Sequence, residues 1–270
     1  MKRAVWFLLL TAVLLSAAAC SPSGGEPSTT PVPVVKVATN PEFEPFEFID
    51  DKQNIAGFDI DLMNALADKL GWHIEYSDMP FESVVASVQS GACEVGISGL
   101  TINAERAESV NFSVPYYSAS QIILVAAGDS TYDGKTKDEI DALLAGKKIG
   151  VCAGFVGIDY VEGYSEDGEV VYPGIAGATA VTYSNISLAI AGLKSGSIEA
   201  IVMDNIVAIQ AAATPENSAA VKAVEVALTE EDYGIIVGKA DTERLNAINT
   251  ALQQLFDDGT VAGLVAQWIG

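Results

Sequence analysis

The chain carries the same local pattern twice, and this repeat is the feature that most restricts its fold. In each copy an amphipathic helix ends at Ser-Gly, and a short apolar strand follows at once; the copies are residues 84–96 and 188–200. Gly91 and Gly196 stand where a helix ends in a left-handed residue, a conformation that glycine adopts without strain. Helices that alternate with buried strands predict an α/β fold.

Each copy belongs to a longer half of the chain with the same order of elements. The first half is predicted to hold strands at 34–39, 73–78 and 94–98 and helices at 58–70 and 81–90. The second half is predicted to hold strands at 147–152, 180–183 and 200–204 and helices at 157–164 and 187–195. Ligands bind beyond the carboxyl ends of strands in open α/β sheets, so two such lobes that face each other predict a cleft.

Composition excludes several classes of function. The 270 residues suffice for two hydrophobic cores, and with half of them hydrophobic the chain is expected to fold. The formal net charge of −22 would repel nucleic acid and anionic membranes. One histidine and three cysteines are too few for a zinc site or a histidine-based nucleophilic mechanism. We therefore expect no metal, no cofactor and no nucleic-acid partner.

The N-terminal residues have the features of a secretory signal peptide, assigned to residues 1–19. Lys2 and Arg3 precede the apolar stretch 4–15, which is too short to span a bilayer. Residues 20–34 are rich in Ser, Pro, Thr and Gly, a composition that suits a flexible tether. The mature chain is therefore expected to function outside the cytoplasm.

Small residues run directly into Cys20, and this segment resembles the lipobox of bacterial lipoproteins. The resemblance implies cleavage before Cys20 and attachment of lipid, palmitate included, to that cysteine. The position three residues before the cysteine holds Ala17 where a lipobox usually has leucine. Ordinary secretion, with cleavage after an Ala-x-Ala site, is the alternative. The lipoprotein interpretation places the chain in the periplasm or on the outer face of the cell membrane.

The two remaining cysteines are expected to be free. Cys93 and Cys152 could form a disulfide outside the cytoplasm, but each lies in an apolar strand, where a thiol packs as a small hydrophobe. Residues 150–154 match a Gly-x-Cys-x-Gly nucleophile elbow, yet the only histidine, His73, begins a strand of the other half. The acidic runs at 138–139 and 229–232 are interpreted as solvated surface. No catalytic residue is therefore predicted.

Several motifs together resemble one protein family. They are residues 38–48, 57–62, 98–101 with 105–106, and 258–260 with Trp268. In order and spacing they are similar to the polar-amino-acid family (family 3) of periplasmic solute-binding proteins, which are receptors of ABC importers. The resemblance covers residues 35–270. It implies a type II two-lobe binding protein with no enzymatic activity and, as partners, a free amino acid, an ABC permease and its ATPase subunits.

The same resemblance implies how the chain divides into lobes. The first lobe would contain residues 35–119 and 229–270, and the second would contain residues 120–228. Two hinge crossings would join them, near residues 118–121 and 228–232, and a monomer is expected. Closure of the lobes around the ligand would create the surface that a permease recognises.

The ligand-binding residues follow from the chemistry of a zwitterion and from the matched motifs. A free amino acid presents a carboxylate and an ammonium group, which a buried arginine and a buried acid would pair. The resemblance assigns the carboxylate to Arg106 and the ammonium group to Asp204. Taken alone, Arg106 could be a solvated helix residue, and Asp204 could cap the following helix. The Thr101 hydroxyl and the Gly99 carbonyl would complete the ammonium site, with Ser98 on its floor.

The side-chain pocket is expected to be aromatic. Phe43 and Phe81 match family positions that enclose the ligand side chain, while Phe46 is expected to pack beneath them. Asn40 stands where the family often has an acid that selects Lys, Arg or His. An amide at this position favours a ligand with a neutral or polar side chain.

The second lobe departs from the family pattern after the strand at 147–152. The family commonly has Gly followed by Thr and by Thr or Ser, whose hydroxyls and amides bind the carboxylate; here the run is Gly154-Phe155-Val156-Gly157. The backbone N–H groups of Phe155 and Val156 could still bind an anion at a helix N-terminus. The Phe155 ring is expected to intrude on the pocket and shape its specificity.

Two other functions remain open on the sequence. One is an enzyme on the same scaffold, similar to cyclohexadienyl dehydratase, which would need a general acid or base in the cleft. Apart from Asp204 and Glu42, the sequence offers few candidates. The other is an extracellular sensory module that binds the same ligand and passes on a signal.

Overall fold

The computed structural model describes residues 32–166 and 168–270. The predicted signal peptide, Cys20 and the tether up to residue 31 lie outside the described residues. Within the described ranges, none of the helices combines the length and the apolar character that crossing a membrane requires.

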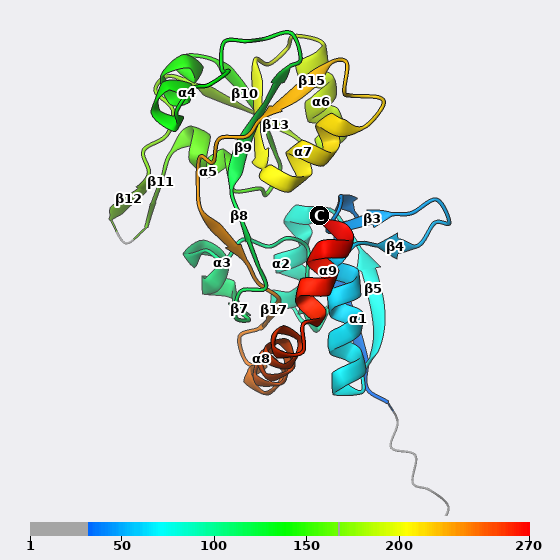
Figure 1. Ribbon diagram of the computed structural model, residues 1–270. Coiled ribbons are helices and arrows are strands. Elements are labelled where there is room, and N and C mark those ends of the chain that lie inside the picture. The colour runs from blue at the N-terminus through cyan, green and yellow to red at the C-terminus, as the bar shows by residue number, and fades with distance from the viewer. Residues whose placement is uncertain (1–31, 167) are drawn as a thin grey trace, which may run out of the picture. The chain divides into compact units, whose positions relative to one another are not determined.

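The first lobe is built on a five-stranded sheet (Figure 1). In spatial order its strands are β5 (His73–Asp78), β1 (Val34–Thr39), β6 (Val95–Gly96), β17 (Ile236–Gly238) and β7 (Val110–Phe112). β1 is parallel to β5 and β6, with Val37 opposite Val95, and β17 is antiparallel to β6 and β7. The carboxyl ends of β1 and β6 therefore meet at one edge, where the predicted binding motifs begin.

The second lobe repeats this arrangement with other residues. Its strands are β13 (Thr179–Tyr183), β10 (Lys148–Cys152), β14 (Ala200–Asp204), β9 (Gln121–Ala126) and β15 (Val221–Val224). β10 is parallel to β13 and β14, and β9 is antiparallel to β14 and β15. Two sheets of one topology confirm the two similar α/β lobes that the internal repeat predicts.

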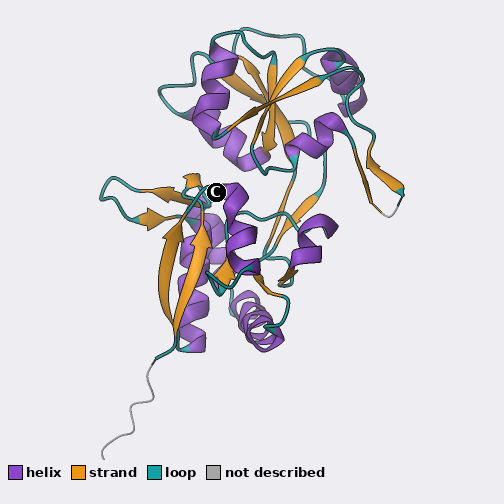
Figure 2. Cartoon of the chain, turned by 180° about the vertical axis from the view of Figure 1, so that it is seen from behind, coloured by secondary structure: helices purple, strands orange, loops and turns teal. Residues whose placement is uncertain are grey.

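Helices cover the sheets of both lobes (Figure 2). Those of the first lobe are α1 (Phe58–Leu70), α2 (Phe81–Gln89), α3 (Ala104–Ser109), α8 (Thr242–Asp257) and α9 (Thr260–Trp268). Those of the second are α4 (Lys137–Leu144), α5 (Gly157–Glu162), α6 (Ile186–Lys194) and α7 (Asn205–Ala213). Helix α1 buries Leu62, Met63 and Leu66, whose spacing places them on one face. Burial of such side chains stabilises each lobe by about 1.5–3 kcal/mol per residue.

Two short strands carry the chain between the lobes. β8 (Tyr117–Ala119) leads from β7 to β9, and β16 (Glu231–Tyr233) leads from β15 back to β17. The two strands pair antiparallel, with Glu231 opposite Ala119 (Figure 1). This ladder confirms the two predicted crossings.

Two small sheets were not predicted. β2 (Glu42–Phe43), β3 (Glu47–Ile49) and β4 (Ile55–Ala56) form a three-stranded antiparallel sheet beside the first lobe's binding edge. β11 (Tyr164–Glu166) and β12 (Glu169–Tyr172) form a two-stranded antiparallel sheet of the second lobe. Their strands are too short to produce a clear hydrophobic alternation in the sequence.

Local backbone geometry explains why one strand and one helix are shorter than predicted. The strand predicted at 94–98 pairs regularly only at Val95–Gly96, and Gly99 then turns the chain with φ of 52°. The helix predicted at 157–164 ends at Glu162 because Gly163 has φ of 96°. Gly91 and Gly196 have φ of 76° and 74° directly after their helix C-caps, which confirms their predicted role.

Candidate ligand-binding site

A small cavity lies between the lobes at the carboxyl ends of their strands. Its volume is about 10 Å³, close to the space of one water molecule. Its lining consists of eight residues that the sequence predicted to bind ligand: Phe43, Phe81, Gly99, Thr101, Arg106, Phe155, Val156 and Asp204. The fold therefore brings these residues together from both lobes. The cavity is too small for an amino acid, so binding requires the lobes to part or a side chain to move.

Arg106 reaches this cavity from the first turn of α3. The Asn103 side chain caps the helix by accepting a hydrogen bond from the Arg106 N–H at 2.9 Å. Nη1 donates to the Thr101 carbonyl at 2.8 Å, and Nη2 donates across the cleft to the Gly154 carbonyl at 2.9 Å. Burial lowers the pKa of the guanidinium, against the charges of Asp204 and Glu231. Its hydrogen-bond partners within the described ranges are neutral, so the guanidinium is suited to an anion.

Asp204 brings the opposite charge from the second lobe. The residue ends β14, is 4% exposed, and accepts a hydrogen bond from the Tyr233 hydroxyl at 2.6 Å. It occupies the N-cap position of α7, but its side chain makes no capping hydrogen bond, which contradicts the capping alternative. Burial raises the pKa of this carboxyl, and the bond from Tyr233 is the largest effect in the other direction. The side chain thus presents a buried carboxyl group, held by Tyr233, to the cavity.

Three of the residues that line the small cavity are aromatic, and the Phe155 ring contacts the other two. The Phe155 ring, 8% exposed, contacts Phe43 edge-on with ring centroids 5.4 Å apart and Phe81 at 4.7 Å. Phe46, expected to pack beneath Phe43 and Phe81, is 1% exposed and contacts the Phe43 ring with ring centroids 5.6 Å apart. Phe155 therefore occupies the position between the two rings that were expected to enclose the ligand side chain.

The backbone around these rings leaves little freedom. A Cβ atom on Gly99 would lie 2.5 Å from the Phe43 ring, and its φ of 52° is one that glycine readily adopts. The expectation that the Phe155 N–H could bind an anion is wrong, because this group donates to the Cys152 carbonyl at 3.1 Å in the turn before α5.

Two predicted residues do not line the cavity. Ser98 is fully buried beneath it: its hydroxyl donates to Glu47 at 2.7 Å and accepts from the Asn40 N–H at 3.0 Å. The expectation that Ser98 forms the floor is therefore wrong, since its polar atom is engaged below the surface. The Asn40 side chain donates to the Met79 carbonyl at 3.0 Å, which orients its amide beside the Phe81 helix. Both side chains thus lie behind the loop 98–101, which carries Gly99 and Thr101 to the cavity.

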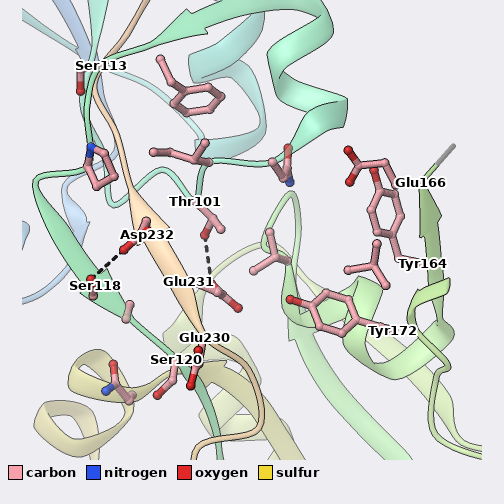
Figure 3. A pocket seen from close by; sticks show the side chains of 18 residues that line it. Thr101, Ser113, Ser118, Ser120, Tyr164, Glu166, Tyr172, Glu230, Glu231 and Asp232 are labelled. Atoms are coloured by element: carbon pink, nitrogen blue, oxygen red, sulfur yellow. Dashed lines mark hydrogen bonds between the residues drawn. The ribbon is translucent and has the colours of Figure 1, made fainter. Parts of the chain in front are cut away.

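Glu231 is a buried residue that the sequence interpretation missed. It was assigned to solvated surface, yet it is 8% exposed, because the alternation of β16 turns Glu231 and Tyr233 inward and Asp232 outward. It accepts a hydrogen bond from the Thr101 hydroxyl at 3.1 Å (Figure 3) and another from the Gln121 side chain at 3.3 Å. Burial and the charge of Asp204 raise its pKa to about 7. The Thr101 hydroxyl was expected to contact the ammonium group of the ligand, but it is hydrogen-bonded to Glu231 on β16, one of the two strands that cross between the lobes.

A larger cavity of about 1070 Å³ adjoins the first across Thr101 and Val156 (Figure 3). Among the described residues, its lining combines six neutral hydroxyl or amide side chains with six carboxyl or phenol groups and includes no lysine or arginine. The carboxyl and phenol groups belong to Glu166, Glu230, Glu231, Asp232, Tyr164 and Tyr172. This lining favours cationic over anionic solutes in the space next to the hinge.

The two cysteines of the described chain are free and buried, as expected. Burial raises the pKa of the Cys152 thiol to about 12. A buried thiol with so high a pKa is protonated at neutral pH and does not form a thiolate nucleophile. His73 lies on the exposed start of β5, away from Cys152. The cysteine motif therefore does not form a nucleophile elbow.

Comparison with known proteins agrees with this geometry. A family model described as bacterial extracellular solute-binding proteins, family 3, matches residues 35–270. A protein named a probable histidine-binding protein from Neisseria gonorrhoeae is 32% identical over 270 residues, which cover 96% of this chain and 94% of that protein.

Solved structures show the same likeness. An ancestral arginine-binding protein bound to arginine superimposes with a TM-score of 0.76 at 37% identity, over 88% of this chain and 98% of that one. The ancestral amino-acid-binding protein AncCDT-1, a precursor of cyclohexadienyl dehydratase, gives a TM-score of 0.75 at 30% identity, over 88% and 96% of the two chains. The chain belongs to family 3 of the bacterial extracellular solute-binding proteins.

Proposed function

We propose that this chain is an extracytoplasmic receptor that closes around a free amino acid and delivers it to an ABC permease. The observation that carries this proposal is the pairing of Arg106 and Asp204, two oppositely charged side chains on different lobes that line one cavity. A zwitterion would place its carboxylate on the guanidinium and its ammonium group on the carboxylate. The ligand would then join the lobes in addition to the bond from Arg106 to Gly154.

The ligand is proposed to have a neutral or polar side chain. Asn40 offers an amide where an acid would select a cationic side chain, and Phe155 narrows the aromatic pocket. The relatives named for histidine or arginine make cationic amino acids the competing ligand class. The acidic lining of the larger cavity is the structural feature that favours this competitor.

A melting-temperature screen of the 20 amino acids, cystine and small peptides tests the function and the ligand class together. At equal concentration, a ligand that binds the folded chain more tightly raises its melting temperature more. We expect the largest increase from a neutral or polar amino acid, with smaller increases from arginine and lysine. The largest increase with arginine or lysine would refute the ligand class, and no increase with any compound would refute the receptor function.

The same screen on the Phe155→Ala variant tests whether Phe155 shapes the specificity of the pocket. Removal of the ring opens the space between Phe43 and Phe81, so amino acids with large side chains should gain affinity relative to small ones. The variant retains Arg106 and Asp204, and the ranking of ligands should therefore change while recognition of the zwitterion persists. An unchanged ranking would show that Phe155 does not shape specificity.

We further propose that Cys20 anchors the mature chain to the membrane by lipid after removal of residues 1–19. The run of small residues before Cys20 supports this proposal. In a bacterial host, the chain should fractionate with membranes and incorporate labelled palmitate, and Cys20→Ser should abolish both. A Cys20→Ser chain that still carries the label would contradict the assignment. Mutation of Cys93, which is buried, to alanine provides the control.

The receptor is proposed to release its ligand unchanged. The likeness to a precursor of cyclohexadienyl dehydratase makes an enzyme the alternative, and Asp204 is the acid that the small cavity could offer to such a reaction. Nuclear magnetic resonance of the bound amino acid after prolonged incubation separates the two, because only an enzyme would convert it.

A further inference from the structure

Two carboxyl groups lie buried behind the loop that forms the first-lobe side of the binding cavity. Glu47 on β3 and Asp59 on α1 are both 0% exposed. The Ser98 hydroxyl donates to Glu47 Oε1 at 2.7 Å, and the Gly99 N–H donates to Asp59 Oδ2 at 2.8 Å. Tyr116 donates its hydroxyl to the same Asp59 oxygen at 2.8 Å. The pair therefore holds Ser98 and Gly99, of which Gly99 lines the cavity.

The other oxygen of each carboxyl group has no hydrogen-bond donor among the described groups. These atoms are Glu47 Oε2 and Asp59 Oδ1, and both are buried. The two residues lie on β3 and α1, which pack against each other, and each carboxyl group affects the pKa of the other. Two ionised carboxylates in contact would repel, and each would have an unsatisfied buried oxygen. One proton between these two oxygens satisfies both.

We propose that Glu47 and Asp59 share one proton at neutral pH and that this proton positions Ser98 and Gly99 for ligand binding. Glu47 is the carboxylic acid that donates, and Asp59 is the carboxylate that accepts from Glu47, Gly99 and Tyr116. The positioning role rests on the proposed function of the cavity, whereas the shared proton does not. Glu47 is thus a positioning residue, since it acts on the ligand site through Asp59 and Ser98.

The charges around the pair favour this assignment. Burial is the largest effect on both groups: it raises the pKa of Glu47 well above its usual value and that of Asp59 to about 6. The charge of Asp204 on β14 adds to the rise in the pKa of Glu47. Tyr116, before β8, acts in the opposite direction on Asp59, because the hydrogen bond from its hydroxyl lowers the Asp59 pKa. The two effects favour the protonated form of Glu47 and the ionised form of Asp59.

The shared proton makes stability depend on pH with a definite sign. The unfolded chain releases the Glu47 proton above pH 4.5, while the folded chain retains it at neutral pH. The folded state then binds one proton more, so stability falls as pH rises, by a factor of ten in the folding equilibrium per pH unit. Between pH 7 and 8, Asp59, with its pKa raised to about 6, is mostly ionised in the folded chain, so the Glu47 proton supplies most of this slope.

The test compares Glu47→Gln, Asp59→Asn and the double variant with the wild-type chain. In Glu47→Gln, the amide N–H of the glutamine replaces the carboxylic acid as the donor to Asp59. In Asp59→Asn, the amide N–H of the asparagine donates to an ionised Glu47. Each single variant therefore keeps a hydrogen bond between the two side chains without the shared proton. In the double variant two NH₂ groups face each other with no acceptor between them. Glu75→Gln and Asp68→Asn neutralise exposed acids on β5 and α1 and are the controls.

We expect both single variants to lose the tenfold change per pH unit, measured as the difference from wild type in urea unfolding between pH 7 and 8. This difference cancels the contribution of Glu231, which titrates in every chain. The infrared difference spectrum, wild type minus single variant at pH 7.5, should show the carbonyl band of a protonated carboxylic acid for each variant, because the contribution of Glu231 is common to all chains and cancels. The two controls should keep both the slope and the band.

Ligand affinity provides the readout of the positioning role. For the amino acid with the largest effect in the screen, the single variants should bind within about threefold of wild type, and the double variant at least tenfold more weakly. The proposal of a shared proton would be refuted if the wild-type chain lacked the pH slope or the carbonyl band. It would also be refuted if either single variant could not fold. A double variant with wild-type affinity would overturn the positioning role. If no amino acid binds, the receptor function fails, while the slope and the band still decide on the proton.

Discussion

Arg106→Ala is expected to weaken binding of the amino acid by about 2–5 kcal/mol, a loss of about 30- to 4000-fold in affinity. The Arg106 guanidinium is the cation among the residues that line the cavity, and its loss would leave the ligand carboxylate without a charged partner. The variant also loses the bond from Arg106 to Gly154 that joins the lobes. Isothermal titration calorimetry with the preferred ligand of the screen measures the change.

The Arg244→Ala variant is the matched control for this experiment. Arg244 lies on α8, where it pairs with Asp241 and packs over Trp72 outside the cavity. Its removal should leave affinity within about threefold. The ligand-free Arg106→Ala chain should melt close to the wild-type temperature, because burial of the guanidinium is itself unfavourable. An affinity change below tenfold for Arg106→Ala would remove this residue from the binding site.

Asp204→Asn is expected to reduce affinity by about 2–4 kcal/mol. The asparagine carbonyl can still accept the hydrogen bond from Tyr233, so the variant removes the negative charge while the local geometry persists. A carboxylic acid analogue without the amino group shows whether this charge serves the ammonium. The wild-type chain should reject that analogue by at least 100-fold relative to the amino acid, and Asp204→Asn by less than tenfold. Calorimetry of both ligands with both chains gives the coupling.

Tyr233→Phe separates the charge of Asp204 from its orientation. This variant removes the 2.6 Å hydrogen bond to Asp204 but leaves the carboxylate in place. We expect a loss of about 1 kcal/mol or less, with rejection of the analogue retained. Equal rejection of the analogue by the wild-type and Asp204→Asn chains would mean that another group binds the ammonium.

The sequence predicted the architecture because its strongest signals are periodic. Helix 58–70 and the strands at 34–39, 73–78 and 200–204 were predicted with the bounds that the structure has. A glycine directly after a helix indicates a left-handed backbone conformation, and this signal explains why helix ends could be predicted from the sequence. The small sheets were missed because strands of two to four residues have too little alternation to detect.

The candidate site could be predicted because the resemblance supplied residues that are far apart in the chain. Arg106 and Asp204 are separated by almost a hundred residues, and neither has a local signal that identifies a ligand. The resemblance placed Arg106 in the helix after the motif at 98–101 and Asp204 at the end of a strand, and the fold brings both to one cavity. Whether they bind a ligand there is the prediction that the variants test.

The rest depended on tertiary contacts that no spacing encodes. Glu231 belongs to an acidic run, and only its inward position on β16 reveals that it is buried. Ser98 was placed on the cavity floor, but Glu47 turns its hydroxyl away from the cavity. Glu47 and Asp59 come from different elements, so their contact follows from the packing of β3 on α1. The position of the Phe155 ring depends on how the lobes close.

A crystal structure of the chain with its preferred amino acid tests the central claim most directly. The account predicts that the Arg106 guanidinium binds the ligand carboxylate through two hydrogen bonds, while an Asp204 oxygen accepts from the ammonium group of the same molecule. A ligand bound elsewhere, or Arg106 and Asp204 both turned toward solvent in the liganded chain, would contradict it.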